Sequence, residues 1–270
     1  MSRSSPAPGE SDSQIQVSRD GVIATVVLNR PQKLNALTLP MWRQLGAIFT
    51  ALSQEEDLRC ILLRGAGEQA FSPGNDISEF ATERKDREQA VVYGRVMATT
   101  AKALDDCRHP IVAQIHGICV GGGLELASLC DLRICGESSR LGIPIKNLGL
   151  VMSYPELVPL LRLIGEGRAL ELLLEGRILD AREALAMGLV SRVVADAAVA
   201  KEAQAAAQRI AEGAPLVARW HKQFVRRLRP PLPALTEAES LECFSCFDTE
   251  DFGIGYRAFL AKQKPQFRGR

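Results

Sequence analysis

The stretch PIVAQIHGICVGGGLELASLCDLRI, residues 110–134, carries the strongest fold signal in the chain. Residues 110–120 form a nearly continuous apolar run typical of a buried strand, three glycines follow at 121–123, and residues 122–130 predict a short helix. In that helix Glu125 stands between Leu124 and Leu126. A strand that turns through glycines into a helix leaves unpaired backbone N–H groups at the helix start, where an anionic oxygen can approach closely.

The pattern of strand followed by helix recurs on both sides of this stretch. Residues 15–28 alternate around an Asp-Gly turn and predict a hairpin, residues 58–65 and 132–136 predict buried strands, and residues 40–53 and 83–106 have helical spacing. This order predicts an α/β fold with largely parallel strands. From about residue 155 most segments favour helix, with one strand near 189–194.

Composition limits the classes of function. The 270 residues carry a formal net charge of +1, which favours neither nucleic acid nor a membrane surface as a partner, and no apolar run reaches the eighteen or so residues of a membrane span. Seven scattered cysteines without an apparent signal sequence argue against a disulfide framework and for a cytoplasmic protein. Residues 1–14 are predicted to be a disordered tail.

A second glycine loop, AFSPGNDI at 70–77, follows a predicted strand and could direct the N–H of Asn75 toward the glycines at 121–123. The usual phosphate-binding patterns, G-x-x-x-x-G-K-S/T and G-x-G-x-x-G, do not occur in the chain. Two N–H groups from separate loops suit the oxygen of an enolate or a tetrahedral intermediate instead. A carboxylate in an apolar wall beside them, Glu125, would have a raised pKa suited to acid–base chemistry.

Five ordered segments resemble the crotonase, or enoyl-CoA hydratase/isomerase, superfamily: 28–37 (LNRPQKLNAL), 70–77, 109–134, 174–194 (LEGRILDAREALAMGLVSRVV) and 256–267 (YRAFLAKQKPQF). The resemblance implies a spiral of repeated ββα units over residues 15–198. It also implies a C-terminal helical region, 199–270, that packs on this core and on neighbouring subunits in a homotrimer or a dimer of trimers.

The same resemblance implies an acyl-CoA thioester substrate and no separate cofactor. The N–H groups of Asn75 and Gly122 would hold the thioester oxygen, and Glu125 matches the first catalytic glutamate of the hydratases. Contacts to coenzyme A are implied for six further residues: Lys33, Leu34, Ala36, Asp76, Ile77 and Lys262.

One catalytic position departs from the family pattern. The second glutamate of the hydratases falls on Ile145, which cannot move a proton. In the segment VMSYPELVP, 151–159, either Tyr154 or Glu156 could replace it, although Pro155 could equally start a helix with Glu156 in its first turn. Hydration of a 2-enoyl-CoA is the expected reaction. Decarboxylation, isomerisation and a non-catalytic acyl-CoA-binding or RNA-binding role remain alternatives.

Overall fold

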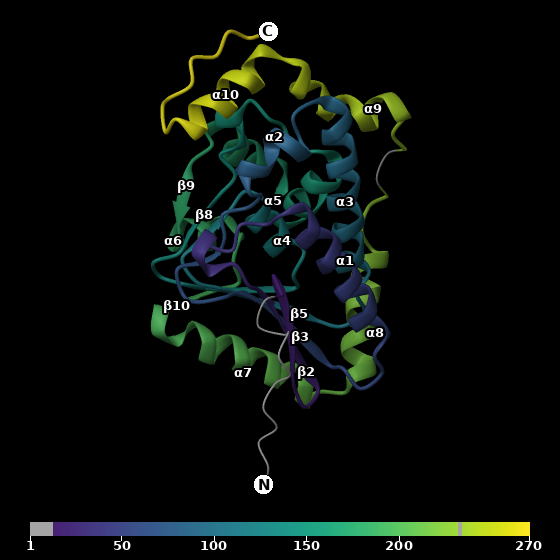
Figure 1. Cartoon of the computed structure of the whole chain (residues 1–270). Coiled ribbons are helices and arrows are strands. Elements are labelled where there is room, and N and C mark those ends of the chain that lie inside the picture. Colours follow the sequence, from purple (N-terminus) through teal and green to yellow (C-terminus); the bar gives the residue numbers. More distant parts are fainter. Residues whose placement is uncertain (1–12, 232–233) are drawn as a thin grey trace.

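The computed structural model describes residues 13–231 and 234–270, and it arranges the strands in two sheets (Figure 1). The larger sheet has the order β1-β2-β3-β5-β7-β10, and the smaller has the order β4-β6-β8-β9. Only the β1–β2 and β8–β9 pairs are antiparallel. The strands are β1 Ile15–Asp20, β2 Ile23–Leu28, β3 Cys60–Gly65, β4 Ala70–Ser72, β5 Ile111–Ile115, β6 Ile118–Val120, β7 Leu132–Gly136, β8 Arg140–Gly142, β9 Ile178–Asp180 and β10 Arg192–Val194.

The helices join these strands in a repeating order. The α-helices are α1 Leu39–Gln54, α2 Phe80–Glu83, α3 Arg87–Asp106, α4 Gly122–Ser128, α5 Tyr154–Glu175, α6 Ala181–Met187, α7 Val199–Glu212, α8 Pro215–Arg227, α9 Glu237–Glu242 and α10 Glu250–Leu260. Three times the chain adds a strand to the larger sheet, then a strand to the smaller sheet, and then a helix: β3-β4-α3, β5-β6-α4 and β7-β8-α5. This confirms the predicted α/β spiral of ββα units.

The single strand expected over residues 110–120 is wrong in one respect. Gly117 adopts a φ of +55°, and a Cβ at this position would collide with the carbonyl of Gln69. The chain therefore bends at Gly117, so that β5 belongs to the larger sheet and β6 to the smaller one. The short strands β8 and β9 were not expected from the sequence, because three residues are too few to show a periodicity.

The long helix expected over residues 83–106 begins at Arg87 instead. The side chain of Asp86 accepts a hydrogen bond from the N–H of Gln89 at 2.9 Å and caps α3, so residues 80–83 form a separate short helix, α2. The predicted hairpin of β1 and β2 and the predicted helix α1 are confirmed, the latter with one extra residue at each end.

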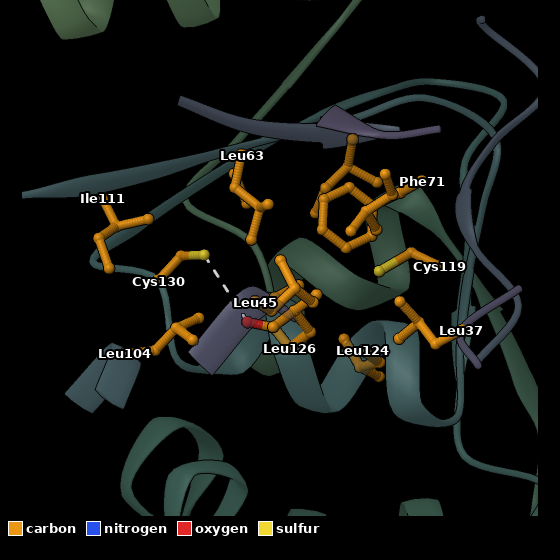
Figure 2. Close-up of a cluster of buried hydrophobic side chains, with 14 of the residues drawn as sticks. Leu37, Leu45, Leu63, Phe71, Leu104, Ile111, Cys119, Leu124, Leu126 and Cys130 are labelled. Atoms are coloured by element: carbon orange, nitrogen blue, oxygen red, sulfur yellow. Dashed lines mark hydrogen bonds between the residues drawn. The ribbon is translucent and has the colours of Figure 1, made fainter. Parts of the chain in front are cut away.

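Apolar side chains pack against both faces of the larger sheet. Helix α7 covers one face with a row of alanines that includes Ala203 and Ala207. The other face packs on α1, α3 and α4, and Figure 2 shows Leu124 and Leu126 of α4 in the same buried cluster as Phe71. Burial of its leucines fixes α4, and with it the acid between them.

The C-terminal helices lie outside these layers. Helices α9 and α10 lie at the end of the molecule opposite to α7 (Figure 1). Helix α8 buries none of its residues in the chain. No helix in the described ranges is long and apolar enough to cross a membrane. Most of the predicted tail, 1–14, lies outside the described residues, and the division at residue 198 stays a prediction.

Candidate active site

The two glycine loops predicted from the sequence lie against each other. The first loop follows β4 and contains Gly74, and the second joins β6 to α4 through Gly121. Gly74 has a φ of +98°, and a Cβ placed there would lie 2.7 Å from the backbone nitrogen of Gly122. A side chain at residue 74 would therefore force the loops apart, and their contact depends on glycine.

Asn75 is held in place on both sides of its own amide. The N–H of Leu37 donates to the carbonyl of Gly74, and the N–H of Asp76 donates to the carbonyl of Leu37, both at 2.8 Å. The side-chain oxygen of Asn75 accepts a 2.7 Å hydrogen bond from Trp42 Nε1. Within the described residues no hydrogen bond uses the N–H of Asn75, so this donor remains for a ligand.

The backbone N–H of Gly122 is the second donor. Gly122 is the first residue of α4, so its N–H has no intrahelical acceptor. Gly122 also adjoins the first loop, because a Cβ on it would lie 3.4 Å from both Gly74 Cα and Asn75 Oδ1. Two rigid backbone donors from separate loops are the arrangement that stabilises a developing oxyanion.

Glu125 lies in the first turn of α4, and its Oε2 is buried without a hydrogen-bond partner in the described part of the chain. Burial raises the pKa of this carboxyl well above its usual value. The nearby charge of Glu156 raises the pKa further, and that of Arg84 lowers it. A carboxyl group in this setting is protonated at a higher pH than usual and can act as a general acid.

The carboxyl of Glu125 lines a cavity of about 20 Å³ between α3, α4 and α5. An outer groove of about 780 Å³ adjoins this cavity. The two share the following lining residues: Ala98, Ala101, Leu129, Pro155 and Pro159. Glu125 thus lies beside the inner wall of a groove large enough for a ligand.

Of the two candidates for the missing second acid, Glu156 lines the cavity of Glu125, whereas Tyr154 lines the outer groove. The carboxylate of Glu156 is fixed by the Ser153 N–H at 2.5 Å and by the Ser153 hydroxyl at 2.7 Å. Glu156 therefore both caps α5, as the helix-start interpretation predicts, and lies close to Glu125. Ile145 packs among apolar side chains.

Five of the six residues expected to contact coenzyme A lie in or beside the loop that contains Gly74 and Asn75. Leu34 has a left-handed φ of +53°. The chain then continues through Ala36 to Leu37, which pairs with Asn75 of the loop. The guanidinium of Arg30 binds the carbonyl of Ala36 at 2.8 Å and the carboxylate of Asp76 at 3.0 Å. Asp76 also accepts a hydrogen bond from the N–H of Ser78, as a local cap does. Lys33 is exposed and Ile77 is partly buried beside them.

A comparison with models of protein families shows to which family the chain belongs. The model of the enoyl-CoA hydratase/isomerase family matches residues 18–270. The chain belongs to this family. Among solved structures, a crystal structure described as an enoyl-CoA hydratase/carnitine racemase from Magnetospirillum magneticum is 50% identical, with a TM-score of 0.80 and 96% of each chain covered.

Two further members of the family illustrate its range. A probable enoyl-CoA hydratase from Rhizobium meliloti is 36% identical, covering 94% of this chain and 97% of its own length. A methylmalonyl-CoA decarboxylase solved with 2-nitronate-propionyl-CoA is 26% identical, with a TM-score of 0.82 and coverage of 96% of this chain and 99% of its own. The family membership predicted from the sequence is confirmed.

One predicted ligand of coenzyme A, Lys262, is not brought to this family's site within the chain. It follows α10, is exposed and has a φ of +52°. No contact in the described residues links it to the oxyanion loop. Its contact with coenzyme A therefore stays a prediction.

Sequence reasoning missed three residues that shape this enoyl-CoA hydratase/isomerase site: Trp42, Tyr93 and Arg84. Trp42 donates to Asn75, and the Tyr93 hydroxyl lies 3.5 Å from the same side-chain oxygen. In the sequence Trp42 and Tyr93 are indistinguishable from core residues of α1 and α3. Nothing in the local sequence around Arg84 signals that its charge is buried.

Proposed function

We propose that the protein adds water to the double bond of a 2-enoyl-CoA thioester through an enolate intermediate. The contact between the two glycine loops beside the buried carboxyl of Glu125 carries this proposal. The N–H groups of Asn75 and Gly122 would bind the thioester oxygen, where charge develops as the double bond is attacked. The hydratase named among the relatives supports the same reaction.

The two acids divide the proton transfers in this proposal. Glu156, held by Ser153, takes a proton from water as its oxygen bonds to Cβ, and Glu125 gives its proton to Cα. One O–H bond of water and the Cα–Cβ double bond are broken, and a proton then passes from Glu156 to Glu125 to restore the starting state. Only protein groups act, so no separate cofactor is needed.

Decarboxylation of an acyl-CoA is the second candidate. The observation that favours it is Ile145, which removes the glutamate that hydratases use, together with the similarity to a methylmalonyl-CoA decarboxylase. Loss of carbon dioxide from such a substrate also produces an enolate, which the same two N–H groups would stabilise. In this reaction Glu125 would only have to protonate the enolate carbon.

Subunit assembly and compartment belong to the same proposal. The exposed face of α8 presents Trp220 and Phe224, each 49% exposed, and Leu228, directly after the helix, is 85% exposed. Such a face on one helix favours contact with another copy of the chain. We propose a homotrimer or a dimer of trimers, which light scattering would measure. Seven free thiols favour a reducing compartment such as the cytoplasm.

One assay separates the two reactions. Crotonyl-CoA and methylmalonyl-CoA are offered to the same preparation, and loss of the enoyl absorbance and release of carbon dioxide are followed. We expect hydration of crotonyl-CoA, reduced about 10²- to 10⁴-fold in Glu125→Gln. Carbon dioxide release without hydration would establish the decarboxylase instead. Full turnover by Glu125→Gln would refute the role of this residue in either reaction.

A further inference from the structure

The guanidinium of Arg84 is enclosed by aromatic rings close to the candidate active site. Arg84 ends α2 and is only 8% exposed. The guanidinium carbon, Cζ, lies 4.9 Å from the ring centre of Phe80, 4.7 Å from that of Tyr93 and 5.2 Å from that of Phe247. These contacts stabilise a cation through the faces of the rings.

What Arg84 lacks is an acceptor for its N–H groups. In residues 13–231 and 234–270 its side chain forms no ion pair and donates no hydrogen bond, and its Nε is buried without a partner. Another buried arginine, Arg133, donates to the carbonyls of Leu189 and Cys130. A buried charge without a hydrogen-bonded partner is costly, and aromatic contacts offset only part of that cost.

Arg84 is linked to the loop of Asn75 through Tyr93, whose ring it contacts. The Tyr93 hydroxyl lies 3.5 Å from the side-chain oxygen of Asn75. One helical turn further along α3, Met97 lines the cavity of Glu125. The charge of Arg84 also acts on Glu125, since it lowers the pKa of that carboxyl.

We propose that Arg84 binds a carboxylate carried by the acyl group of the substrate, so that the enzyme acts on thioesters of dicarboxylic acids. This inference rests on the proposed acyl-CoA function and specifies its substrate class. A guanidinium is planar, and its N–H groups lie in one plane that the oxygen pair of a carboxylate matches. The other anionic source is a phosphate of coenzyme A, which the test below distinguishes.

The experiment measures binding and therefore needs no turnover. Calorimetry compares butyryl-CoA with succinyl-CoA, which has the same number of acyl carbons but a carboxylate in place of the terminal methyl group. Pentanoyl-CoA and glutaryl-CoA form the second such pair. We expect the wild-type protein to prefer the carboxylate in at least one pair. In Arg84→Gln we expect that preference to fall roughly 10- to 100-fold, because a charge-assisted hydrogen bond is lost.

The matched control is Arg87→Gln, which removes the same charge three residues away. Arg87 is exposed, and its guanidinium lies 3.3 Å from the carboxylate of Asp248. We expect it to keep the wild-type preference. Free coenzyme A is the third ligand: its affinity should be the same in the wild type and in Arg84→Gln, since the carboxylate belongs to the acyl group.

Three results would overturn the inference. In the first, the wild-type protein binds neither carboxylate ligand more tightly than its uncharged partner. In the second, Arg84→Gln weakens the binding of both members of each pair equally. In the third, Arg84→Gln weakens the binding of free coenzyme A, which would assign Arg84 to a phosphate. The wild-type comparison stands even if Arg84→Gln fails to fold. Hydration of crotonyl-CoA without a carboxylate preference would refute this inference alone, whereas failure of every thioester to bind would refute the proposed function.

Discussion

Glu125 in the first turn of α4 and Glu156 in the first turn of α5 line the same small cavity. Burial raises the pKa of Glu125, and the negative charge of Glu156 raises it further. The sequence resemblance puts the second hydratase glutamate at Ile145, and in the structure a carboxylate from α5, Glu156, lines the cavity of Glu125.

The substitution Glu156→Gln tests this relationship. We expect kcat to fall about 10²- to 10⁴-fold, since the group that accepts the proton of water is lost. The limb of the pH–rate profile that reports Glu125 should move to lower pH, because one cause of its raised pKa is removed. Steady-state kinetics from pH 5 to 9 measure both effects.

The control for Glu156→Gln is Glu166→Gln, an exposed position on the same helix, which should leave the profile unchanged. The rival interpretation is tested by Tyr154→Phe. A larger loss of kcat in Tyr154→Phe than in Glu156→Gln would assign the second role to the tyrosine.

The loop contact predicts a large effect of one methyl group. In Gly74→Ala the new Cβ would lie 2.7 Å from the nitrogen of Gly122, and the φ of +98° disfavours alanine. Displacement of one oxyanion donor should reduce kcat about 10²- to 10³-fold. Gly67→Ala has a similar φ, +72°, with no atom within 4 Å of its Cβ, so it adds backbone strain alone.

We expect Gly67→Ala to lose about 1 kcal/mol of stability and to keep its kcat. The two variants are compared by kcat and by urea unfolding. If Gly74→Ala lost stability while its kcat stayed at the wild-type value, the loop contact would be structural and the oxyanion role of Gly122 would be wrong.

The spiral fold and the glycine loops could be predicted because their signals are local. The turn at Asp20 and Gly21, the apolar run of β3 and the glycines at 121–123 each lie within about ten residues of sequence. The bend at Gly117 could not be predicted, because an isolated glycine in an apolar run does not show that the chain passes from one sheet to the other there.

The second acid could not be settled from the sequence. Glu156 fits a helix start equally well whether or not it faces Glu125, and only the packing of α5 against α4 decides this. Arg84 is a similar case. Its aromatic neighbours come from α2, α3 and a segment near residue 247, so no local pattern shows that the charge is buried.

The pH dependence of stability follows from the raised pKa of Glu125. Because its folded pKa is raised, the folded state binds more protons than the unfolded state above about pH 4, the ordinary pKa of a glutamate. The stabilisation is complete below that pH and is lost as the pH rises through the folded pKa. Glu125→Gln has no carboxyl to ionise at this position and does not lose this stabilisation. We therefore expect the Tm of Glu125→Gln minus the Tm of the wild type to increase from pH 4 to pH 8. A constant difference across this range would contradict the raised pKa.

His109 predicts the opposite dependence. Burial, aided by the positive charges of Arg219 and Arg108, lowers the pKa of His109 to about 4, and neither ring nitrogen has a partner in the described residues. The folded pKa of His109 is below the unfolded value of about 6.5. The contribution of this histidine to stability is therefore complete above pH 6.5 and is lost as the pH falls toward 4. We expect this loss to be on the order of 1–3 kcal/mol.

In His109→Leu no proton can be taken up at this position, so the free energy of unfolding should fall less between pH 7 and pH 4.5 than in the wild type. Urea unfolding at several pH values measures the two slopes, and His221→Asn, at an exposed position, is the control for loss of a histidine. Equal slopes for the wild type and His109→Leu would show that the imidazole is protonated in the folded state, against the burial argument. A difference confined to His109→Leu would identify this histidine as a source of acid sensitivity in the fold.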